Sequence, residues 1–186
     1  MFFNNLRRLL TSIKIIMYKL AYFFAVSLVC CMSSFAQNSN ACNCCTAQYQ
    51  GFDFWLGEWE VTTNNGQIAG YNSIKKVQNN CVVQENWTSA NPGYTGTSYN
   101  FFNARNNQWE QIWIDSSGQS LHLKGERTEK AMILKSDPVL NKDQKTTYNQ
   151  ITWTANSDGT VRQLWEVFTE GEEVKVAFDG LYRKKK

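Results

Sequence analysis

The chain has 186 residues, enough for one domain, with 19 basic and 16 acidic residues and a formal net charge of +3. Its first 36 residues hold four of the basic residues and no acidic one, so the remainder carries 15 basic against 16 acidic residues and is nearly neutral. A nearly neutral domain without a basic face lacks the electrostatic footprint of a nucleic-acid-binding protein, so no nucleic-acid partner is expected.

Residues 1–36 have the layout of a secretory signal peptide. A short basic start at Met17 precedes an apolar run of 13 residues over 20–32, which is too short to span a bilayer comfortably. Small residues at Ser34 and Ala36 then favour a cut before Gln37. Residues 1–16 would make this leader oddly long, which favours Met17 as the true start. Cleavage predicts a protein exported to the periplasm or the outside of a bacterial cell, with no stable membrane span left.

Two alternatives to a cleaved leader remain open. Residues 13–32 could be an uncleaved membrane anchor, although Lys14 and Lys19 interrupt the apolar span. A lipid-attachment cut at Cys30 or Cys31 is the other alternative, but neither cysteine follows the small residue that such a cut prefers.

A short segment, residues 37–51, contains three of the four cysteines that follow the leader, namely Cys42, Cys44 and Cys45; the fourth is Cys81. An even number of cysteines in an exported protein favours disulfides. A bond between the neighbours Cys44 and Cys45 would be strained, so we expect one of the first three to pair with Cys81. A soft-metal thiolate site at residues 42–45 is the alternative.

Residues 52–61 predict one short helical turn, then Gly57, then a first strand anchored by Trp59. From Gly57 onward, turn residues such as those at 64–66 separate segments that run mostly 8–12 residues. The expected strands are 57–63, 67–78, 81–89, 94–102, 108–114, 119–127, 130–136, 146–155, 160–169 and 173–183, with one long loop at 137–145.

Ten short strands without a crossover helix predict an all-β fold, a ten-stranded antiparallel up-and-down β-barrel, with a strongly curved sandwich as the alternative. The barrel domain is expected over residues 52–183. Residues 184–186 form a basic tail, which we expect to be a solvated terminus. A barrel of this strand number is wide enough to hold an internal cavity.

Strand alternation predicts which side chains face the interior. Glu85 shares a face with Val83 and Trp87, and a carboxylate there is costly unless it is paired or wet. It would therefore contact a ligand or pair with Arg162 or Arg183, unless a bulge turns it outward. Ligand sites combine an apolar wall with a few polar groups. The candidate ligand-binding residues are Glu85, Trp87, Tyr99, Trp113, Trp153, Gln163 and Trp165. The alternative is that the aromatic side chains simply fill the barrel.

Little in the sequence is catalytic. It contains neither a glycine-rich phosphate-binding loop nor a nucleophile elbow, and no catalytic residue is assigned. The sequence has one histidine, His122, which alternates with Leu121 and Leu123 and shares its face with Lys124. We therefore expect His122 to face solvent, and no metal or cofactor is predicted.

The stretch Gly57-Glu58-Trp59 resembles the Gly-x-Trp start of the first strand in lipocalin-like and fatty-acid-binding barrels, the calycin group. Arg183 in the last strand resembles the lipocalin arginine that packs over that tryptophan, a cation–π contact. The whole opening, 52–61, and the ending, 178–183, resemble a family of uncharacterised exported bacterial barrels. The resemblance covers residues 52–183.

Nitrobindins, ten-stranded haem barrels, are the functional relatives that this likeness suggests. They would imply ferric haem held by one histidine. Here that ligand would have to be His122, which lies in mid-chain, whereas the family ligand sits near the chain end.

We expect an exported, monomeric barrel that binds a small apolar or amphipathic molecule against aromatic walls. A haem-binding protein or enzyme is the first alternative. A cell-envelope interaction protein with a filled barrel is the second.

Overall fold

The computed structural model describes residues 14, 17–18 and 42–185. Apart from those three positions, the predicted leader lies outside the described residues, as do the alternatives at Cys30 and Cys31. The chain divides into two units, of which the second, Cys42–Lys186, contains the barrel. Within the described ranges, no helix is long and apolar enough to cross a lipid bilayer.

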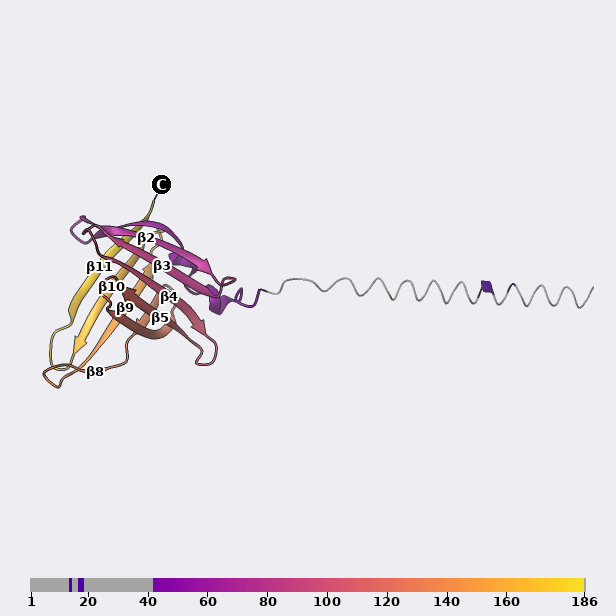
Figure 1. Cartoon of the computed structure of the whole chain (residues 1–186). Helices are drawn as coiled ribbons and strands as arrows, with labels where there is room; N and C mark the ends of the chain where they lie inside the picture. Colours follow the sequence, from indigo (N-terminus) through magenta and orange to yellow (C-terminus); the bar gives the residue numbers. More distant parts are fainter. Residues whose placement is uncertain (1–13, 15–16, 19–41, 186) are drawn as a thin grey trace, which may run out of the picture. The chain divides into compact units, whose positions relative to one another are not determined.

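The barrel unit begins with two short 3₁₀ helices and continues as strands joined by tight turns (Figure 1). The helices are η2 (Ala47–Gln50) and η3 (Asp53–Trp55). The strands are β1 (Gly57–Thr63), β2 (Ile68–Val77), β3 (Val82–Ser89), β4 (Thr95–Asn103), β5 (Gln108–Asp115), β6 (Ser120–Arg127), β7 (Ala131–Lys135), β8 (Val139–Leu140), β9 (Thr146–Ala155), β10 (Val161–Thr169) and β11 (Lys175–Lys184). The ten expected strands are all present, and their bounds agree to within two residues.

The strands form one antiparallel sheet that closes on itself. Apart from the short β8, each strand pairs with the next one along the chain, so β7 pairs with β9 and β9 with β10. β10 also pairs with β11, and β11 pairs with β1 from Trp59 opposite Lys184 to Thr63 opposite Gly180. The short β8 pairs with the start of β9 and lies in the segment expected to be one long loop. The result confirms an all-β fold with a closed ten-stranded barrel.

One end of the barrel is filled by aromatic side chains from the segment that precedes β1. The Phe52 ring lies 4.9 Å from Trp55 and 5.2 Å from Trp153, centroid to centroid. Trp59 Nε1 donates a hydrogen bond of 2.8 Å to the Trp55 carbonyl. These four side chains have no exposed surface, and each large ring removes about 150–250 Å² from water. We call this end the closed end.

The cation over Trp59 is Lys184, not Arg183 as the lipocalin resemblance implied. Lys184 Nζ lies 5.3 Å from the Trp59 ring, because the two residues are directly opposite in the β1–β11 register. Arg183 is opposite Glu60, one position along, and therefore lies on the other face of the sheet. There its guanidinium donates to Thr62 Oγ1 at 3.1 Å.

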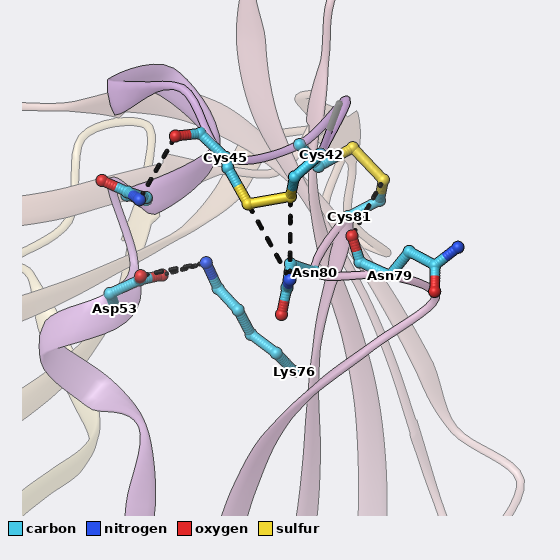
Figure 2. The surroundings of a disulfide bond; sticks show 9 residues. Cys42, Cys45, Asp53, Lys76, Asn79, Asn80 and Cys81 are labelled. Atoms are coloured by element: carbon cyan, nitrogen blue, oxygen red, sulfur yellow. Dashed lines mark hydrogen bonds and ion pairs between the residues drawn. A yellow bond between two sulfur atoms is a disulfide. The ribbon is translucent and has the colours of Figure 1, made fainter. Parts of the chain in front are cut away.

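Two disulfides join the segment before β1 to itself and to the barrel. Cys44 bonds to Cys81 in the turn between β2 and β3, which agrees with the expected bridge to Cys81, and Cys42 bonds to Cys45. Figure 2 shows Asn80 beside the second bond, with its Nδ2 3.8 Å from Cys42 Sγ. The four cysteines within residues 42–185 are thus used in disulfides rather than in a thiolate metal site.

The same figure shows an ion pair that holds η3 against the sheet. Lys76 Nζ on β2 lies 2.7 Å from Asp53 Oδ1, and the lysine side chain is largely buried. The closed end is therefore fastened to β2 and its turn by one covalent bond and one charged contact.

Removing the Cys44–Cys81 bond should destabilise the fold more than removing the Cys42–Cys45 bond. The first closes a loop with a sequence separation of 37 and the second one of 3, so the chain-entropy losses are about 4 and about 2 kcal/mol. Thermal and denaturant unfolding of the two paired serine variants, Cys44→Ser with Cys81→Ser and Cys42→Ser with Cys45→Ser, would measure the difference. Equal losses, or the reverse order, would contradict this account.

Candidate ligand-binding cavity

The other half of the barrel encloses a cavity of about 500 Å³. Its mouth is bordered by the β1–β2 and β3–β4 turns, where Ile68 and Tyr94 are partly exposed. Trp87 on β3, Trp113 on β5, Trp165 on β10 and Phe178 on β11 line its wall. The interior is therefore filled at the closed end and hollow towards the open end.

Two glycines leave room for two of the tryptophan rings. A β-carbon on Gly96 would come within 2.1 Å of the Trp113 ring, and one on Gly70 within 2.7 Å of the Trp87 ring. No side chain could occupy either position without moving the ring. A glycine inside a strand often marks such a close approach, and aromatic side chains commonly cover it.

The floor of the cavity is polar and is centred on Glu85. Its carboxylate accepts hydrogen bonds of 2.6 Å from Asn72 Nδ2 on β2 and of 2.6 Å from Ser98 Oγ on β4. These partners flank β3 in the sheet and point inward, as Glu85 does. Glu85 therefore faces the interior, and neither a bulge nor an arginine partner is involved.

The hydrogen bonds continue from Ser98 and from Asn72 around the floor. Asn100 Nδ2 donates to Ser98 Oγ at 2.9 Å, and Gln111 Nε2 donates to Asn100 Oδ1 at 2.8 Å. On the other side, Asn72 Nδ2 lies 3.4 Å from the Tyr182 hydroxyl, which donates to Gln163 Oε1. Glu85, Gln111, Gln163 and Tyr182 all border the cavity.

Burial controls the ionisation of this floor. It raises the pKa of Glu85 to about 7, despite the opposing hydrogen bonds from Ser98 and Asn72. Burial, followed by the charge of Glu85, raises the pKa of Tyr182 well above its usual value. Near neutral pH such a group is present both as a carboxylate, which only accepts hydrogen bonds, and as a carboxylic acid, which can also donate one.

Five of the seven candidate ligand-binding residues border the cavity: Glu85, Trp87, Trp113, Gln163 and Trp165. Trp153 faces inward but lies in the packed core beside Phe52. Tyr99 is on the outer surface, 44% exposed, where Gln84 Nε2 donates to its hydroxyl at 3.3 Å. The expected inward face of β4 was therefore wrong, because Ser98 and Asn100 occupy it.

The sequence reasoning did not find Asn72, Ser98, Gln111 or Tyr182 as floor residues. The available signal was the alternation of two polar residues, Ser98 and Asn100, on the strand that follows Glu85 along the chain. In the structure Ser98 is directly opposite Glu85, and Asn100 is opposite Val83. A carboxylate predicted to face inward requires polar neighbours on the adjoining strands.

His122, the sequence's one histidine, lies on the outer face of β6, with 47% of its side chain exposed. Its Nε2 is 2.9 Å from Glu110 Oε2. Partial burial raises the pKa of Glu110, but hydrogen bonds from Asn103 and His122 outweigh this and keep it below its usual value. His122 is therefore placed to pair with Glu110 rather than to ligate haem inside the barrel.

The fold and the cavity define a closed ten-stranded antiparallel barrel with an aromatic wall and a polar floor, which is consistent with a calycin-like fold. No protein-family model matches this sequence, and no curated protein matches it significantly.

The raised pKa of Glu85 predicts that the folded protein loses stability as the pH rises from about 4.5 to about 7. In that range the unfolded chain releases the Glu85 proton while the folded chain keeps it, so the free energy of unfolding falls by about 3 kcal/mol. Glu85→Gln should lack this component of the pH dependence. Unfolding titrations across that range would measure it.

Glu110→Gln is the matched control, because Glu110 lies outside the cavity and its pKa is shifted in the opposite direction. That variant should keep the fall that Glu85 causes. If the free energy of unfolding depends on pH in the same way in Glu85→Gln and in the wild-type protein, the pKa of Glu85 is not raised by folding.

Proposed function

We propose that this protein is an exported binding protein that holds a small amphipathic molecule inside its barrel. The observation that carries the proposal is the cavity of about 500 Å³, which combines indole walls with a few convergent polar groups. An apolar face of about 200 Å² placed against such walls would gain about 5 kcal/mol. The polar floor would orient the molecule and select it.

Both disulfides support export, because such bonds persist in oxidising compartments such as the bacterial periplasm and the cell exterior. The predicted leader supports it independently. We propose that the protein acts there as a monomer, with the bound molecule as its partner. The cavity favours this role over an envelope interaction protein with a filled barrel.

The proposal predicts that a small molecule accompanies the protein when it is purified from its native source. Native mass spectrometry should show a mass excess that disappears on denaturation, and extraction should recover the molecule. Leu121→Trp should abolish the excess, because Leu121 borders the cavity and the larger ring would occupy it.

Ile112→Trp supplies the control, since Ile112 lies on the outer face of the neighbouring strand β5 and is 39% exposed. That variant should retain the mass excess. A ligand-free wild-type protein that also binds no amphipathic probe would refute the proposed function.

A further inference from the structure

Glu85 is a buried acid without a charged partner. The ion pairs within residues 42–185 join other side chains, and none of them includes Glu85. A buried carboxylate without a counter-ion is costly, so it either takes up a proton or acquires a cation from elsewhere.

The hydrogen bonds around Glu85 fit the ionised form. Ser98 Oγ already accepts from Asn100 Nδ2, so its own hydrogen is directed at Glu85 Oε2. Asn72 presents its amide nitrogen, which can only donate. Two donors therefore face a group that can accept about four hydrogen bonds as a carboxylate. Acceptor capacity is therefore left over on a carboxylate that borders the cavity.

The aromatic wall adds a second preference for positive charge. Trp87 follows Glu85 by two positions on the same face of β3, and Ser98 is paired with Glu85 on one side and with Trp113 on the other. The carboxylate thus shares the inner face of the sheet with two nearby indoles that border the same cavity. The faces of such rings attract cations, and tryptophan does so best.

Among the residues that border the cavity, Glu85 carries the one formal charge, and lysine, arginine and histidine do not occur. A carboxylate or phosphate headgroup would find no partner there and would be repelled by Glu85. A cationic nitrogen would find both a carboxylate and ring faces.

We propose that the bound molecule carries a cationic nitrogen, as an amphipathic amine does, which pairs with Glu85 while its apolar part lies between the tryptophan rings. This rests on the proposed function and names the chemical class of its ligand. The ammonium group donates to the free acceptor positions of Glu85. The class excluded is the anionic lipid or fatty acid.

Binding of such a cation is coupled to a proton. The groups that face Glu85 from the neighbouring elements are Asn72 on β2, Ser98 on β4 and Tyr182 on β11, and of these Tyr182 alone titrates. Lys76, also on β2, is held by Asp53 at the closed end. Below neutrality an amine therefore displaces the proton of Glu85, and above neutrality it meets a carboxylate that is already ionised.

Isothermal titration calorimetry with decylamine, decanol and decanoate tests the proposal, because the three probes share one alkyl chain and differ in the headgroup. At about pH 8, decylamine should bind at least about tenfold more tightly than decanol, and decanoate most weakly. At about pH 6, binding of each decylamine molecule should release about one proton from Glu85. The dependence of the binding enthalpy on the ionisation enthalpy of the buffer measures this number.

Glu85→Gln should remove both the tenfold preference for decylamine over decanol and the proton release, and Glu110→Gln should alter neither. Should Glu85→Gln fail to fold, Trp113→Leu provides a second test: it should weaken decylamine binding several-fold more than decanol binding.

If decanol or decanoate binds the wild-type protein as tightly as decylamine does, the proposal of a cationic ligand is wrong, but the proposed function still stands. Decylamine binding that is unaffected by Glu85→Gln would overturn the cationic ligand as well. Failure of all three probes to bind would instead contradict the proposed function itself.

Discussion

The pairing of β1 with β11 is the constraint on which the rest of the structure depends. It turns a meander into a closed wall, so every second residue along each strand has to face one shared interior. Phe52 and Trp55, which enter from the segment before β1, fill that interior at one end. The other end is left hollow, and its lining decides what the protein can hold.

Closure also explains why the interior tolerates an acid. Glu85 lies where the packed end gives way to the cavity, so its hydrogen-bond partners come from the strands on both sides of β3, and β11 supplies Tyr182 beside one of them. An open sheet could not surround it in this way. The polar floor is the boundary between the filled and the hollow half of the barrel.

The strands could be predicted from the sequence because turn residues separate them and because the chain contains hardly any helix-forming segments. The inward face was predictable wherever it is apolar, as with Leu121 and Leu123 on β6. The predicted inward face was wrong on β4, where hydrophobicity favoured Tyr99 although Ser98 and Asn100 face the floor. The partner of Trp59 was missed by one residue, since register decides between Arg183 and Lys184 and no local pattern reports it.

Two positions in the barrel wall, Gly70 and Gly96, have no side chain, and this affects the width of the cavity. The indoles of Trp87 and Trp113 occupy the space that a side chain at Gly70 or Gly96 on the adjoining strand would fill. A ring packed close to the backbone cannot move outward when a ligand binds, because the hydrogen-bonded strands behind it are rigid. The barrel itself therefore sets the width of the cavity, and under the proposed function this width would limit the thickness of the bound molecule.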